Sequence, residues 1–184
     1  MNDFTLRGTV PEQIRAQFNI SKNLLLYAWF VYPFFSVSEM HILSVLELAL
    51  KTRIGDKGLN ELRKLKKKRG LFSYIEYAQS KKWIANTDFR AYHRAPNEIA
   101  RHEYMLRKLE EMKEKGLDWI DLDFDDIKVP ETNSIDYIGV LLDTVNEIRN
   151  THAHGETLLY PASVWRSFEM VSDFVNALFP ETPK

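Results

Sequence analysis

The 184-residue sequence contains no cysteine, which excludes disulfide bonds and thiolate metal ligands. It also lacks a long apolar run, because the longest one, residues 24–35, is shorter than the roughly 20 residues of a membrane helix and is interrupted by Pro33. The first residues have no basic segment followed by an apolar one, so we expect no signal peptide. The net charge of −1 argues against binding nucleic acid through overall charge. We therefore expect a cytoplasmic protein without membrane contact.

Helical periodicity dominates the sequence. Apolar residues recur at steps of three and four positions, which predicts an all-α protein. The first two helices are expected to form a hairpin around Pro33, with Glu39 in the first turn of the second helix. This second helix is apolar on almost every side over residues 40–50, so we expect it to be central and buried. Gly55 and Gly58 are expected to end it.

Three later helices are predicted from their caps and breakers. Asn97 is expected to cap a surface helix over residues 98–115, which Gly116 ends. One of residues 132–134 is expected to cap the next helix, and Pro161 starts the last one. The buried stripe of the helix between them is expected to consist of Ile138, Leu141, Leu142, Val145 and Ile148.

Charge is unevenly distributed along the chain. Residues 51–69 hold nine Lys and Arg residues against two acidic ones, a net charge of +7. Residues 110–126 hold eight acidic residues against two lysines, a net charge of −6. The basic cluster is interpreted either as a solvated helix face or as a surface that binds the phosphates of RNA. Its candidate RNA-binding residues are Lys64, Lys66, Lys67, Lys68 and Arg69.

A dense group of polar side chains follows the apolar stripe of the helix that begins near residue 134. Within six residues stand Arg149, Asn150, His152 and His154. Histidine exchanges protons near neutral pH, and arginine binds phosphate bidentately while keeping its charge. Asn150 can orient a phosphate oxygen or hold the arginine. These residue types can cleave RNA without a metal, with a group that accepts the 2′-hydroxyl proton and a cation at the phosphate.

Helical geometry limits how this group can act. In an unbroken helix, Arg149 and His154 would point about 140° apart, whereas Asn150 and His154 would share a face. For the arginine and the histidine to converge, either the helix loosens over residues 151–153 or two copies of the chain meet there.

The order Arg149-Asn150, three residues, His154 resembles the R-[polar]-x3-H motif of the HEPN superfamily. The resemblance also covers an N-terminal helical hairpin and a motif helix followed by one last helix. It implies a single HEPN-like domain over residues 1–184, in which 58–130 is an insertion between hairpin and motif helix. It further implies a homodimer with an active site across the dimer.

The function implied by the resemblance is metal-independent endoribonuclease activity, with no cofactor, by attack of the 2′-hydroxyl on RNA. The family includes toxins and phage-defence effectors, so an antitoxin protein is a further expected partner. The match to the family motif implies that His154 is the acid or base, and His152 stays an alternative. Other members are non-catalytic modules that bind a protein or RNA, and some act beside a nucleotidyltransferase.

Other interpretations of the same residues stay open. Glu47, in an apolar stretch, is either a carboxylate at the rim of the packed face or a partner for Arg149 or a histidine. Arg149 could instead pair with Glu147, and His154 could cap the helix end. The histidines lack further ligands at usable spacing, so no metal site is expected. The aromatic residues at 29–35 are expected in the core or at a dimer face.

Overall fold

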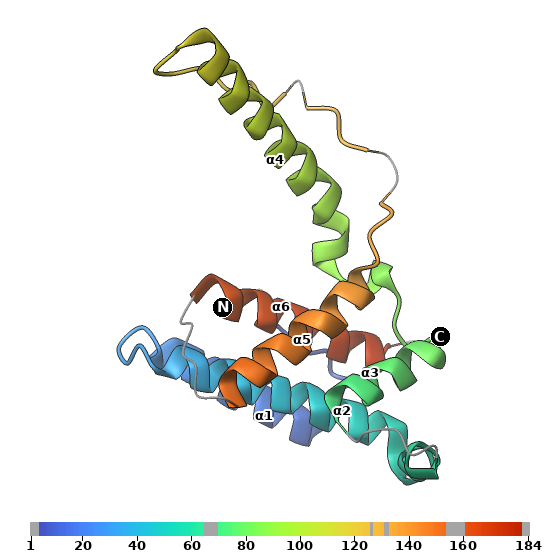
Figure 1. Cartoon of the computed structure of the whole chain (residues 1–184). Helices are drawn as coiled ribbons and strands as arrows, with labels where there is room; N and C mark the ends of the chain where they lie inside the picture. Colours follow the sequence, from blue (N-terminus) through green and yellow to red (C-terminus); the bar gives the residue numbers. More distant parts are fainter. Residues whose placement is uncertain (1–3, 65–69, 126, 131–132, 154–160, 182–184) are drawn as a thin grey trace. The chain divides into compact units, whose positions relative to one another are not determined.

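A computed structural model describes residues 4–64, 70–125, 127–130, 133–153 and 161–181. Every regular element of this described part is helical, so the all-α prediction is confirmed for it. None of its helices is both long and apolar enough to span a membrane. The elements are α1 (Glu12–Tyr27), α2 (Phe34–Lys64), α3 (Leu71–Ser80), the 3-10 turn η1 (Asn86–Asp88), α4 (Arg90–Lys115), α5 (Tyr137–Ala153) and α6 (Pro161–Leu178) (Figure 1).

The chain divides into two compact units. The first comprises residues 1–89 and 137–184 and holds α1–α3, η1, α5 and α6. The second comprises residues 90–136 and consists of α4 with the irregular segment that follows it. We call them unit 1 and unit 2. The helix α3, which lies within the predicted insertion 58–130, belongs to unit 1.

The helix α2 is the centre of unit 1, as its apolar sequence predicts. It contacts α1, α3, α5 and α6 (Figure 1). Ile42, Leu46 and Leu50, four residues apart on one face, are completely buried. Fully burying such a side chain contributes about 1.5–3 kcal/mol, so this face contributes substantially to the packing of the unit.

The predicted break of this helix is confirmed at Gly55 and wrong at Gly58. Gly55 has a positive φ of 66° and interrupts the helical backbone, but helix resumes after it and runs to Lys64. A Cβ atom at Gly58 would lie 2.7 Å from the Ile54 Cγ2 atom and 2.8 Å from the Tyr77 hydroxyl. Gly58 is therefore a site of close approach between α2 and α3 rather than a helix stop.

Aromatic rings pack together in unit 1 at Phe89 and Tyr137, the residues at which the chain leaves this unit and returns to it. The Phe89 ring is fully buried, and its centroid lies 5.0 Å from that of Tyr137 and 5.8 Å from that of Phe174. The backbone amide of Ile138 donates to Asn86 Oδ1 at 3.0 Å. These contacts fix the start of α5 against η1.

In unit 2, α4 begins at Arg90, so the prediction that Asn97 caps it is wrong. Pro96 favours a later start, because proline lacks an amide hydrogen and cannot donate to the carbonyl four residues earlier, that of Tyr92. The structure supplies another donor, because Asn133 Nδ2 donates to the Tyr92 carbonyl at 2.6 Å. The role predicted for Asn133 as a cap of α5 is also wrong, since α5 begins at Tyr137.

Candidate functional site

The helix α5 carries the first part of the motif, Arg149 to Ala153, at its C-terminal end. Ile138, Leu141 and Val145 are buried along the predicted stripe, and α5 contacts α2 and α3. The backbone is helical through Ala153, so Arg149, Asn150 and His152 stand on the last turns of an anchored helix.

The side chains of Arg149, Asn150 and His152 lie outside the described part of the structure, and His154 lies outside the described residues altogether. Their convergence therefore stays a prediction. One of the two ways in which they could converge was a loosening of the helix over residues 151–153, but these residues are helical.

The predicted supporting residue Glu47 is half-buried on α2. Its carboxylate forms an ion pair with Lys51 of the same helix, with 2.6 Å between Lys51 Nζ and Glu47 Oε1. The side chain is 24% exposed, which fits a position at the rim of the packed face. Its pairing with Arg149 or a histidine stays a prediction.

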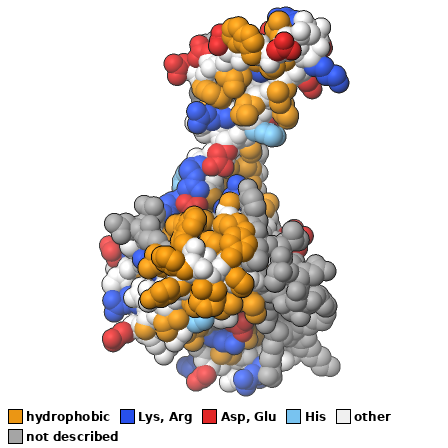
Figure 2. All heavy atoms as spheres, turned by 90° about the vertical axis from the view of Figure 1, so that its left-hand side faces the viewer, with side chains coloured by type: hydrophobic (Ala, Val, Ile, Leu, Met, Phe, Trp, Pro, Cys, Tyr) orange, Lys and Arg blue, Asp and Glu red, His pale blue; other side chains and the backbone are white. Residues whose placement is uncertain are grey.

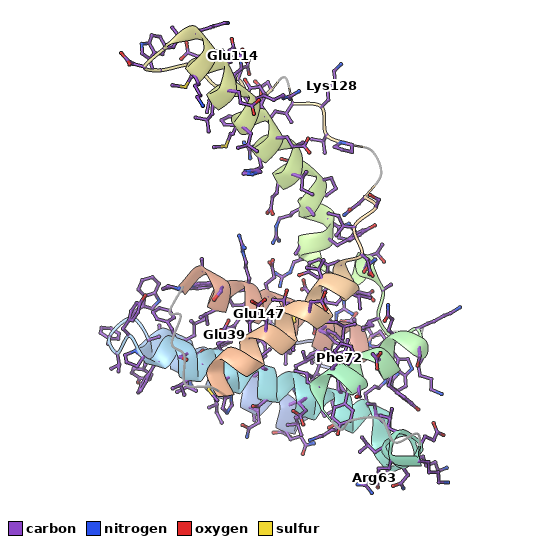
Figure 3. All side chains as sticks on the ribbon, viewed as in Figure 1. Glu39, Arg63, Phe72, Glu114, Lys128 and Glu147 are labelled. Atoms are coloured by element: carbon purple, nitrogen blue, oxygen red, sulfur yellow. The ribbon has the colours of Figure 1, made fainter. Side chains whose placement is uncertain are left out.

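The basic cluster is described as far as the end of α2. Lys64 is exposed at the last residue of the helix, and Arg63, which is labelled in Figure 3, precedes it in the chain. Lys66, Lys67, Lys68 and Arg69 lie outside the described residues.

The described part of the basic cluster has aromatic neighbours that sequence reasoning missed. The Arg53 guanidinium lies 5.1 Å from the centre of the Trp83 ring, and Lys51 Nζ lies 5.7 Å from that of Tyr74. Cationic and aromatic side chains together form the kind of surface that binds single-stranded nucleic acid. Tyr74 is buried and belongs to the core, so we call Lys51, Arg53 and Trp83 the basic–aromatic surface. A run of Trp and Tyr after the basic cluster was the available signal.

A buried carboxylate was also missed. Glu39 of α2, labelled in Figure 3, is 5% exposed. Its Oε1 atom accepts a hydrogen bond from Ser167 Oγ at 2.8 Å and a longer one from Ser163 Oγ at 3.5 Å, both on α6. A buried carboxylate needs such donors. Two serines four residues apart on the apolar α6 were the signal in the sequence.

A serine–histidine contact joins α1 to α2. The Oγ of Ser21 lies 2.7 Å from His41 Nδ1 and also donates to the Gln17 carbonyl at 3.2 Å. Ser38 Oγ donates to the backbone carbonyl of Ser21. Because Ser21 is completely buried, its hydroxyl cannot meet a substrate, and the contact is structural.

Comparison with known proteins gives no further assignment. No family model, curated protein sequence or solved structure matches this chain. The candidate site is therefore argued from its own residues.

Proposed function

We propose that this protein is a metal-independent endoribonuclease of the HEPN type. The observation that carries the proposal is the sequence Arg149-Asn150, three residues, His154. Its position supports this, because it begins in the last turns of a helix that packs on the central α2 and precedes the final helix of an all-α unit. A toxin or phage-defence role would follow from the same resemblance.

In the proposed reaction, His154 accepts the proton of a ribose 2′-hydroxyl, with His152 as the alternative base. The 2′-oxygen attacks the adjacent phosphorus, and the bond from phosphorus to the 5′-oxygen breaks. The imidazole of the second copy donates a proton to that leaving oxygen, which balances the proton taken. Arg149 neutralises the phosphate and Asn150 orients it. The products are a 2′,3′-cyclic phosphate and a 5′-hydroxyl.

The proposed dimer needs a contact surface, and the turn between α1 and α2 provides an apolar one. Trp29, Phe30 and Tyr32 are 65%, 83% and 50% exposed, whereas Phe35 is buried, so of these four only Phe35 belongs to the core. Figure 2 shows hydrophobic side chains gathered on one face of unit 1. The exposed apolar residues of the turn and its flanks are Leu26, Tyr27, Trp29, Phe30, Val31, Tyr32, Val37 and Met40.

The size of this surface suits a second copy of the chain. An aromatic side chain presents roughly 150–250 Å², so the eight residues expose on the order of 700 Å² of apolar area. A stable interface buries about 800 Å² on each partner, and its core is rich in Tyr, Trp, Phe and Met. An isologous dimer through this turn would also supply the second histidine that the reaction requires.

A second candidate function is a non-catalytic module that binds RNA or a protein. The basic–aromatic surface favours it, because binding there needs no histidine. Binding of intact RNA that weakens steeply with salt and depends on the lysines at 64–68 would support this alternative. Such a module could act beside a nucleotidyltransferase.

The test is cleavage of a structured RNA by purified protein in EDTA. The Arg149→Ala and His154→Ala variants should each lose about 100-fold or more of the rate, the usual contribution of a positioned acid, base or charge. Arg166→Ala, at an exposed arginine of α6, is the matched control and should keep full activity. Unchanged rates in both motif variants would refute the proposal.

A further inference from the structure

The helix of unit 2 buries little of its own apolar surface. Among the described residues of this unit, Ala100 is the one that is buried. Ile99, Met105, Leu106 and Leu109 of α4 are 43–57% exposed. Figure 2 shows hydrophobic side chains of this unit open to solvent among charged ones. A helix of this length is normally stabilised by packing of its apolar face rather than by propensity.

The segment that follows α4 covers a different side of the helix. The Asp123 amide donates to the Tyr104 hydroxyl at 3.0 Å, and the Phe124 ring lies 5.9 Å from the Tyr104 ring. The Arg101 guanidinium lies 4.9 Å from the centre of the same Phe124 ring. At about 100° per residue, these contacts gather on one side of α4, and Leu106 projects on the opposite side. The returning segment therefore leaves the apolar side open.

The open side has the spacing of a helix-pairing seam. Ile99 and Leu106 are seven residues apart, and Leu109 follows three later, which is the a/d pattern of coiled coils. His102 and Lys113 lie along the same stripe, and a polar residue at such a position sets register.

One edge of this seam is mainly acidic, with three glutamates and one arginine, Arg107, which give it a net charge of −2. Glu103, Glu110 and Glu114 are exposed and fall along the same edge of the stripe at about 100° per residue. Residues at the edges of a helix pair choose the partner by charge. The acidic edge therefore fits a helix whose corresponding edge carries Lys or Arg.

A second copy of α4 does not provide that charge. In an antiparallel pair, this edge of one copy faces the same edge of the other, and each carries a net charge of −2. In a parallel pair, Glu98 of one copy faces Glu103 of the other. Like charges across a helix pair are destabilising, so both arrangements are disfavoured.

We propose that α4 binds an amphipathic helix of another protein, one with a Leu- or Ile-rich seam bordered by Lys or Arg. The partner helix covers Ile99, Leu106 and Leu109, and its cations pair with the acidic edge. This inference is independent of the ribonuclease proposal, since it concerns unit 2 and is read out by binding alone.

The experiment uses the full-length protein and two fluorescent helical peptides. Both peptides carry the same Leu and Ile seam, and their edge positions are all Lys in one and all Glu in the other. By fluorescence anisotropy, the Lys peptide should bind about tenfold more tightly than the Glu peptide, because several edge pairs each contribute modestly. The difference should shrink at high salt.

A charge-reversed protein gives the decisive comparison. The triple variant Glu103→Lys, Glu110→Lys, Glu114→Lys should prefer the Glu peptide, and Glu12→Lys on α1 should leave the original preference intact. Binding of neither peptide, equal binding of both, or a preference unchanged in the triple variant would overturn the proposal. A loss of self-association by light scattering in Leu106→Glu would assign the seam to a second copy and would overturn it as well.

Discussion

Replacing Asn133 with alanine should weaken the N-terminal part of α4. The Asn133 Nδ2 atom donates to the Tyr92 carbonyl at 2.6 Å, in the place of the amide hydrogen that Pro96 lacks. A neutral hydrogen bond in a partly buried position contributes about 0.5–1.5 kcal/mol. The substitution also removes the acceptor of the Ile135 amide, Asn133 Oδ1 at 3.0 Å. We therefore expect a total cost of about 1–2 kcal/mol.

The background variant Pro96→Ala isolates the hydrogen bond to Tyr92. Alanine at 96 restores the amide that donates to the Tyr92 carbonyl, and it should stabilise the helix by up to about 3 kcal/mol. In that background, Asn133→Ala should lower the stability of α4 by about 1 kcal/mol less than it does in the natural chain. The two substitutions are therefore expected to be non-additive, as residues that serve the same acceptor are.

Hydrogen exchange of the α4 amides measures the loss of stability within α4, because unit 2 can open at a lower free energy than the whole protein. Asn133→Ala should accelerate exchange over residues 93–104 by about tenfold, which corresponds to about 1.4 kcal/mol. Asn60→Ala, which removes a contact to Arg63 on α2, is the control and should leave α4 exchange unchanged. Equal acceleration in the natural and Pro96→Ala backgrounds would refute the reasoning.

Three further predictions concern stability and protonation. Phe89→Ala should lower the free energy of unfolding by about 3–5 kcal/mol, since the ring is fully buried, and the partly exposed Phe72→Ala should cost much less in the same denaturant titration. Ser167→Ala should cost about 1.5–3 kcal/mol because it removes a donor from a buried carboxylate, and a cost no larger than that of Ser44→Ala on the surface would contradict this. Hydrogen bonds from two lysines lower the pKa of Glu111 to about 2. Its stabilising contribution is therefore complete above pH 4.5 and lost as pH falls toward 2, and an NMR titration midpoint near 4.5 would show the reasoning to be wrong.

Local signals predicted much of the helical layout. The apolar stretch at 40–50 identified the central helix, Pro161 marked the start of α6, and Gly116, with its positive φ of 61°, follows the last residue of α4. These features depend on residue type and near neighbours alone, so they can be read without the tertiary structure.

The misses arose where a distant residue compensates for a local break. Judged from neighbouring residues alone, Pro96 is a helix stop. Asn133, far along the chain, supplies the hydrogen bond to the Tyr92 carbonyl that Pro96 cannot donate. Glu39 was assigned to a helix start, but α2 begins earlier, at Phe34, and α6 buries the carboxylate and supplies its donors. Only tertiary packing brings such partners together.

The candidate site also has features that the local sequence predicts and features that depend on tertiary structure. The sequence alone predicts Arg149 and His154 as site residues, because their residue types and spacing are local properties. The Trp and Tyr residues after the basic cluster are a local signal for the basic–aromatic surface, but the contact between Trp83 and Arg53 depends on tertiary packing. Convergence of the motif side chains stays a prediction, and we expect it to require a second copy of the chain.

End-group analysis of RNA incubated with the purified protein in EDTA tests the proposed chemistry most directly. We expect fragments that end in a 2′,3′-cyclic phosphate and begin with a 5′-hydroxyl, and no cleavage of the same sequence made with 2′-O-methyl ribose. His154→Ala should leave the RNA intact. Fragments with 5′-phosphate ends, cleavage of the 2′-O-methyl RNA, or intact RNA with the natural protein would contradict the assignment of Arg149 and His154 to RNA cleavage through the 2′-hydroxyl.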